Sequence, residues 1–159
     1  MRVIVAGGTG FIGSALVRAL QTRGDQVVVL SRKGPDAGSS ALPGIEMLEW
    51  HPPEIGAWAE AFNSVDAVIN VAGRTVVDPL VPWTSAEKRR ILASRVEPTE
   101  AIVRAIAQAS AKPEVLINQS AIGYYGSHGD RILTEESGNG SDFLAGVVRQ
   151  WESAAQPVT

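Results

Sequence analysis

Residues 3–13 read Val3-Ile4-Val5-Ala6-Gly7-Gly8-Thr9-Gly10-Phe11-Ile12-Gly13, and this stretch decides the fold. Its β-branched start predicts a short buried strand, and the residues after the glycines predict a helix. Gly7, Gly10 and Gly13 fall between the two, in the arrangement that brings a backbone close to a diphosphate at a helix N-terminus. The alternative is a turn with a purely structural role. The stretch favours a phosphate-binding loop, in which we expect Thr9, Phe11 and Ile12 to contact the ligand beside the three glycines.

The remaining chain alternates between short apolar runs and helical patterns, as parallel α/β sheets require. Apolar runs without alternation are typical of strands that are covered on both faces. The expected strands are 2–6, 27–30, 45–50, 67–73 and 115–120. The expected helices are 11–23, 55–62, 84–96 and 142–155. Pro98 either kinks the third of these helices or begins a second segment that runs to residue 109. Residues 34–44 are rich in glycine, proline and serine and predict a loop.

Composition describes an ordinary globular chain of 159 residues, 45% hydrophobic and 19% charged. A net charge of −3 and the lack of a basic run argue against a nucleic-acid partner. With no cysteine and two distant histidines, we expect neither a disulfide nor a metal site. No apolar stretch is long enough to span a membrane, and glycines interrupt the N-terminal apolar run, so we expect a cytoplasmic protein without a membrane partner.

Ser31 and Arg32 end the second strand, where a site for NAD would place a carboxylate on the ribose 2′-hydroxyl. No acidic residue stands here. Arg32 offers a planar fork that suits a 2′-phosphate, Ser31 offers a second donor and Lys33 adds charge. The alternative is a solvated basic turn. The tripeptide favours NADP over NAD as the cofactor.

Val71, Ala72 and Gly73 follow the fourth strand, beside the first strand at the switch in strand order, where ligands bind in such sheets. Small residues there would let a nucleotide lie close to the backbone, although a tight turn alone would also explain Gly73. Asn70 is a polar residue in an apolar run, so its burial would oblige it to find hydrogen-bond partners.

Two helix starts carry capping signals. Thr84-Ser85-Ala86-Glu87 has the form of a capping box, and Asp142 has the form of an N-cap for the final helix. The charged run 87–90 that follows Thr84 is most simply a solvated face. Trp50 and Trp58 are expected to pack in the core, and stacking on the cofactor is the alternative.

Three motifs in order resemble the extended short-chain dehydrogenases/reductases, the NAD(P)-dependent epimerase/dehydratase family. They are Gly7-x-x-Gly10-x-x-Gly13, Asn70-x-Ala72-Gly73 and Ser120-x-x-x-Tyr124-Tyr125-Gly126. Ser31-Arg32 and Trp151-Glu152 are similar to motifs of the subfamily known as epimerase family proteins of uncertain substrate. The resemblance implies a nicotinamide cofactor, bound across the carboxyl ends of the first and fourth strands, and a small-molecule substrate.

The resemblance also implies catalysis by a serine or threonine after the fifth strand and by a Tyr-x-x-x-Lys pair on the next helix. Ser120 matches the first position. The pair is missing, because Phe143 or Leu144 stands at the tyrosine position and Val147 or Val148 at the lysine position. Tyr124 and Tyr125 are the only phenols nearby, and we take them with Ser120 as the catalytic candidates.

We therefore expect one Rossmann-type α/β domain over residues 1–159, a doubly wound parallel sheet in strand order 3-2-1-4-5 with helices on both faces. Relatives of this kind continue with a sixth strand and a substrate-binding region, so the chain resembles their cofactor-binding part. The first functional hypothesis is an NADP-dependent oxidoreductase or epimerase for a small carbonyl or hydroxyl compound. The alternatives are a non-catalytic NADP-binding or regulatory module and a fold that has kept no ligand. The flank left by the absent sixth strand predicts self-association as a homo-oligomer.

Overall fold

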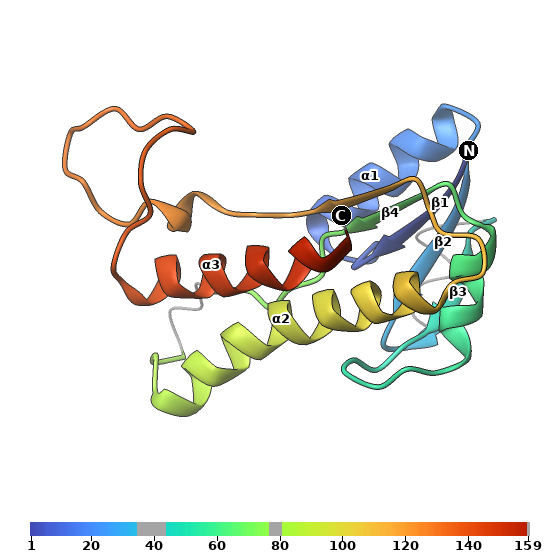
Figure 1. The fold of residues 1–159 in the computed structure, drawn as a ribbon, viewed down its shortest axis with the longest axis horizontal. Coiled ribbons are helices and arrows are strands. Elements are labelled where there is room, and N and C mark those ends of the chain that lie inside the picture. The colour runs from blue at the N-terminus through green and yellow to red at the C-terminus, as the bar shows by residue number, and fades with distance from the viewer. Residues whose placement is uncertain (35–43, 77–80, 159) are drawn as a thin grey trace.

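The computed structural model describes residues 1–34, 44–76 and 81–158, so most of the loop expected at 34–44 lies outside the described residues. Five parallel strands form one sheet in the predicted order β3-β2-β1-β4-β5 (Figure 1). The strands are β1 (Arg2–Ala6), β2 (Gln26–Ser31), β3 (Glu46–Glu49), β4 (Ala67–Asn70) and β5 (Val115–Asn118). The α-helices are α1 (Phe11–Thr22), α2 (Ser85–Gln108) and α3 (Phe143–Ala155), and the 3₁₀ helices are η2 (Ala57–Ser64), η3 (Ile122–Tyr124) and η4 (Gln156–Val158).

The register of the sheet brings the carboxyl ends of its strands to one edge. Ala6 of β1 pairs with Leu30 of β2 on one side and with Asn70 of β4 on the other. Asn70 in turn pairs with Asn118 of β5. The strand order reverses between β1 and β4, and the crevice outside such a reversal is where open α/β sheets bind ligands.

Helices cover both faces of the sheet, as expected of a doubly wound fold (Figure 1). Alternate residues of β1 belong to different cores: Val3 and Val5 pack with Val17 and Leu20 of α1. Ile4 and Ala6 belong to the second core, with Trp58 and Phe62 of η2 and Ala101, Ile102, Ala105 and Ile106 of α2. Helix α3 packs on α2 rather than on the sheet (Figure 1). The sequence prediction of a Rossmann-type fold is confirmed.

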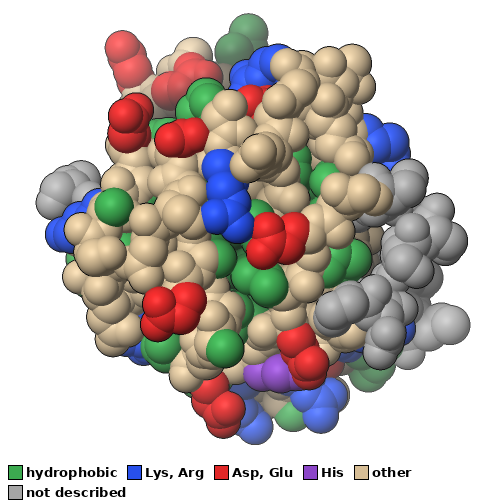
Figure 2. All heavy atoms as spheres, turned by 90° about the vertical axis from the view of Figure 1, so that its right-hand side faces the viewer, with side chains coloured by type: hydrophobic (Ala, Val, Ile, Leu, Met, Phe, Trp, Pro, Cys, Tyr) green, Lys and Arg blue, Asp and Glu red, His purple; other side chains and the backbone are tan. Residues whose placement is uncertain are grey.

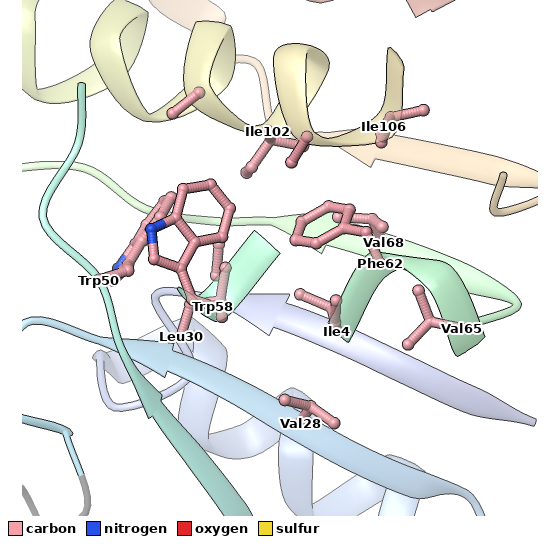
Figure 3. Close-up of a cluster of buried hydrophobic side chains, with 13 residues drawn as sticks. Ile4, Val28, Leu30, Trp50, Trp58, Phe62, Val65, Val68, Ile102 and Ile106 are labelled. Atoms are coloured by element: carbon pink, nitrogen blue, oxygen red, sulfur yellow. The ribbon is translucent and has the colours of Figure 1, made fainter. Parts of the chain in front are cut away.

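Three aromatic rings fill the core between η2, α2 and the sheet (Figure 3). Trp50 and Trp58 meet edge to face with their ring centroids 5.5 Å apart, and Trp58 meets Phe62 in the same way at 5.7 Å. All three side chains are buried, which confirms the core role expected of both tryptophans. Edge-to-face pairs of this kind add about 0.5–1.5 kcal/mol each to the effect of burial.

One helical segment differs from the sequence prediction, and at Pro98 the structure has a single helix rather than the second segment that was one of two expected alternatives. The segment expected as a helix over 55–62 is a 3₁₀ helix that begins at Ala57, and Ile55 lies outside it and is exposed. Gly56 precedes this helix in an extended conformation, so the helical pattern cannot extend back to Ile55. Helix α2 is continuous through Pro98, which lies in its interior and is buried by the packing around it.

Both predicted N-caps are confirmed, but the capping box at Thr84 forms only in half, because Thr84 N donates to Pro82 O instead of to the Glu87 side chain. The Thr84 side chain accepts a hydrogen bond from Glu87 N at 3.2 Å, and Asp142 Oδ1 accepts one from Ala145 N at 2.9 Å. Each cap satisfies a backbone N–H that has no partner within its helix, which is worth about 1 kcal/mol.

The sheet ends at β5, which pairs with β4 alone among the described strands. Val115 and Ile117 of this strand are 42% and 52% exposed, which is high for apolar residues of a parallel sheet.

On the face of the molecule drawn in Figure 2, acidic and basic side chains are interspersed rather than gathered by sign. Among the helices that the structure describes, none is both long and apolar enough to cross a membrane.

Candidate functional site

The loop between β1 and α1 has the geometry that its glycines predict. Gly7 has a φ of +82°, and a Cβ at this position would lie 2.8 Å from Ala72 N in the segment after β4. A Cβ at Gly13 would lie 2.2 Å from Gly7 O, so the start of α1 packs directly on the turn. Gly10 N donates to Gly7 O at 3.0 Å and closes the turn. Only glycine fits at positions 7 and 13 without moving the backbone.

A cavity of about 750 Å³ opens above this loop at the carboxyl edge of the sheet. It brings together predicted residues from three segments: Gly7, Thr9 and Gly10, then Ser31 and Arg32, then Val71, Ala72 and Gly73. Three other predicted contacts, Phe11, Ile12 and Gly13, do not line it, and the Phe11 side chain is 96% exposed. The predicted segments thus converge on one cavity, whereas their contacts with a ligand stay predictions.

The end of β2 forms one side of this cavity. Ser31 is buried, its hydroxyl accepts a hydrogen bond from Lys33 N at 3.3 Å, and its carbonyl accepts one from Trp50 N at 3.1 Å. Arg32 is exposed at the cavity and makes no hydrogen bond within the described residues. An exposed guanidinium beside a fixed serine hydroxyl can receive an anionic group through charge-assisted hydrogen bonds.

A buried hydrogen-bond network holds the segment after β4 at the opposite side. Asn70 Oδ1 accepts from Ala72 N at 3.2 Å, and Asn70 Nδ2 donates to Thr99 Oγ1 at 2.9 Å and to Asn118 Oδ1 at 2.7 Å. Asn70 and Thr99 are both fully buried. The expected need of Asn70 for partners is therefore met from α2 and β5, and the network fixes the position of Ala72 next to Gly7.

Helix α3 joins the same network through Trp151. Its indole Nε1 donates to Thr99 Oγ1 at 3.0 Å, and the ring lies 5.5 Å from the guanidinium of Arg95. Arg95 donates from Nη2 to Arg74 O at 3.0 Å and so braces the segment that follows Gly73. Burial lowers the pKa of the Arg95 guanidinium, because a charged group is poorly solvated there.

The solvated face predicted at the start of α2 is wrong at one position. Glu87 is buried and pairs with Arg74 Nε at 2.7 Å and with Arg90 Nη1 at 3.5 Å. All three side chains line the cavity. Sequence reasoning missed this ion pair because Arg74 approaches from the loop after β4, and no local pattern announces that contact.

The three catalytic candidates lie in the chain after β5 and do not line the cavity. The Ser120 hydroxyl donates to Glu152 Oε1 of α3 at 2.5 Å. The rings of Tyr124 and Tyr125 contact each other edge to face at 5.2 Å, beside the start of α3. Ser120 is thus held by the carboxylate of Glu152, which the sequence identifies only as part of a family motif. Catalytic roles for the three residues stay predictions.

Phe143 is one of the two residues, with Leu144, that can stand where the resemblance implies a tyrosine, and its ring centroid lies 5.6 Å from that of Trp83. The ammonium group of Lys88 lies 5.2 Å from the centroid of the same ring. Within the described part of the chain, no three acidic or histidine side chains gather in a way that could hold a metal ion.

The family model described as the NAD dependent epimerase/dehydratase family matches residues 3–143. This chain belongs to that family. The chain is 34% identical over 157 residues to epimerase family protein SDR39U1 of Homo sapiens and covers 98% of its own length and 49% of the relative's. It is 37% identical over 155 residues to epimerase family protein Mb2239 of Mycobacterium bovis, of which it covers 48%.

A crystal structure of the human SDR39U1 protein (isoform 2) with NADPH superposes with a TM-score of 0.79 and 33% sequence identity. The superposition covers 98% of this chain and 49% of the human chain. The chain therefore spans about half the length of the curated relatives that it matches.

Proposed function

We propose that this chain binds NADP(H) in the cavity at the carboxyl edge of its sheet. The observation that carries the proposal is the convergence of Gly7, Gly10, Arg32 and Ala72 on one cavity at the strand-order reversal. The loop and the N-terminus of α1 would receive the diphosphate, since backbone N–H groups and the helix dipole favour negative charge there.

The end of β2 favours NADP over NAD. Ser31 is the last residue of the strand and Arg32 follows it, and both side chains line the cavity, so a 2′-phosphate at this point would meet a guanidinium and a hydroxyl. No acidic residue stands between positions 26 and 34 to hold a ribose 2′-hydroxyl in its place. The human relative whose structure contains NADPH supports the same choice.

We further propose that the chain belongs to an oxidoreductase or epimerase for a small carbonyl or hydroxyl compound. Ser120 would orient the substrate oxygen, and Tyr124 or Tyr125 would exchange the proton. While the Ser120 hydroxyl donates to Glu152, its oxygen can only accept and would orient a substrate hydroxyl; to donate to a substrate carbonyl it would have to give up the bond to Glu152. The cofactor would supply hydride transfer, which no side chain provides.

A second function is a non-catalytic NADP-binding module that senses or regulates. The observation that favours it is the separation of Ser120, Tyr124 and Tyr125 from the residues that line the cavity. The apolar residues at the positions of the family's tyrosine and lysine also favour a non-catalytic module, because neither Phe143 nor Val147 can transfer a proton.

Dinucleotide binding is tested by calorimetry with NADP and NAD. Gly10 has φ −78° and ψ 177°, which any residue adopts, and a Cβ there meets Gly7 O at 3.3 Å and nothing closer. Gly10→Val should lose binding, because Gly10 lines the cavity. Since the added Cβ is tight against Gly7 O, urea unfolding of the variant must show that it still folds. Gly138→Val is the matched control, since Gly138 is exposed with no atom near its Cβ position. Unchanged affinity in Gly10→Val would contradict the proposed site.

The 2′-phosphate contact is tested with Arg32→Ala. Loss of a charge-assisted hydrogen bond should weaken NADP about tenfold or more, while NAD, which has no phosphate there, should change little. Equal losses for both dinucleotides would refute the role of Arg32.

Turnover separates the two functions. Oxidation of NADPH in the presence of small carbonyl compounds, lost in Tyr124→Phe or Tyr125→Phe with binding retained, would support the enzyme. Tight NADP binding without any turnover across carbonyl and hydroxyl compounds would support the regulatory module instead.

A further inference from the structure

His51 lies at the cavity beside the end of β2. Strand β3 pairs with β2 in parallel register, with Glu49 opposite Ser31, and the hydrogen bond from Trp50 N to Ser31 O extends the ladder by one more step. In this register Arg32, the first residue after β2, is level with Trp50, and His51 comes one residue further along, the second residue after β3. The side chains of Arg32 and His51 line the cavity together with Ser31.

The imidazole of His51 is held by one carboxylate. Its Nε2 lies 2.7 Å from Oε1 of Glu49, the last residue of β3. The His51 side chain is 58% exposed, so the ring can exchange protons with solvent. When both ring nitrogens carry protons, the ring is a cation that is paired with Glu49 through Nε2, and its Nδ1–H is a second donor.

We propose that His51 is a further cationic contact for the 2′-phosphate of NADP, and that its protonation makes the preference for NADP over NAD depend on pH. The inference rests on the proposed binding of NADP at Ser31 and Arg32. An imidazole gains its charge only by protonation, whereas a guanidinium carries a permanent charge, so the two contacts would respond differently to pH.

The charged groups around His51 come from three elements. Arg32, directly after β2, lines the same cavity, and the Glu49 carboxylate on β3 contacts the ring. From α2, Glu97 lines the same cavity, and Arg104 donates from Nη2 to Pro53 O at 2.5 Å, two residues beyond His51. A phosphate placed between Arg32 and His51 would attract both cations, so binding would favour the protonated ring.

Linkage makes the effect reciprocal. If protonation of His51 strengthens NADP binding, NADP must strengthen protonation of His51 by the same factor. The chain contains two histidines, so the imidazole protons of His51 and His128 can be followed separately by NMR. NADP should move the titration of one histidine to higher pH, and NAD should leave both unchanged.

The test measures dissociation constants of NADP and NAD at about pH 6 and about pH 8 for the wild type, His51→Gln and His128→Gln. His128 is the matched control, because its ring contacts Tyr125 O and does not line the cavity. At the lower pH, His51→Gln should bind NADP about fivefold more weakly than the wild type, as expected of one exposed ion pair. At the higher pH the difference should shrink to less than about twofold.

Titration of the 2′-phosphate in free NADP near pH 6 is the same for all three proteins, so the comparison between variants removes that contribution. Equal NADP affinity of the wild type and His51→Gln at low pH would overturn the inference while leaving the proposed function intact. An equal loss of affinity for NADP and for NAD in His51→Gln would also overturn the inference, because it would assign His51 to packing against the part that both dinucleotides share. A wild type that binds neither dinucleotide would refute the proposed function, and the inference with it.

Discussion

Replacing Thr99 by valine should lower the free energy of unfolding by about 2–4 kcal/mol. Valine keeps the shape of threonine and removes only the hydroxyl. The Thr99 oxygen accepts from Trp151 Nε1 at 3.0 Å and from Asn70 Nδ2 at 2.9 Å. Without it, the buried indole N–H loses its acceptor, while Asn70 keeps its bond to Asn118. An unpaired buried donor costs about 1–3 kcal/mol, and the second lost bond adds about 1 kcal/mol.

Urea unfolding followed by tryptophan fluorescence measures this cost as a lower midpoint with an unchanged slope. Thr99→Ser is the matched control, because serine keeps the hydroxyl and loses one methyl group, at a cost of about 1 kcal/mol. A third variant, Trp151→Phe, removes the indole N–H. In the Thr99→Val background it should cost about 1–2 kcal/mol less than in the wild type, because the donor that it removes is already unpaired.

Two results would refute this reasoning. A change of less than about 0.5 kcal/mol in Thr99→Val, the size usual for surface substitutions, would mean that water replaces the hydroxyl. Strictly additive costs for Thr99→Val and Trp151→Phe would mean that the two groups do not share a hydrogen bond in solution.

Two further predictions concern a charge and an edge. The hydrogen bond from Arg23 and the N-terminal ammonium hold the pKa of Asp25 below its ordinary value of 3.8, so its carboxylate stabilises the fold above that pH. Asp25→Asn should therefore lower the urea midpoint at neutral pH. The difference in midpoint between wild type and variant should vanish as the pH falls through the pKa of folded Asp25. An equal difference in midpoint at all pH values would contradict this. The exposed edge at β5 predicts self-association, and Ile117→Lys should weaken the association measured by sedimentation. A wild-type protein that is monomeric at every concentration would contradict this prediction.

The sheet was predictable from sequence because its signals are local. An uninterrupted run such as Val27-Val28-Val29-Leu30 can be satisfied only by burial on both faces, which requires a parallel strand inside a sheet. The caps at Thr84 and Asp142 were equally readable, since each side chain bonds a backbone N–H three residues ahead. Such patterns depend on spacing along the chain and not on distant partners.

The cavity was predictable only in part, for the same reason. Gly7, Arg32 and Ala72 follow three adjacent strands, so parallel topology alone brings them to one edge. Glu87 and His51 belong to the same cavity, yet their neighbours in sequence predict a solvated face and a strand end. Their positions depend on how α2 and β3 pack, which no local spacing records.

Helix α3 connects the two halves of the proposed function. Trp151 and Glu152 are neighbours on it, and the first bonds Thr99 in the network behind Ala72, while the second accepts from Ser120. The wall of the cavity and the candidate catalytic serine therefore share one rigid support, although Ser120 itself lies outside the cavity lining. Because the two contacts come from different side chains, they can be separated. Glu152→Gln alters only the partner of Ser120, so it should change turnover without changing NADP affinity, whereas a loss of both would tie the serine to the cofactor site itself.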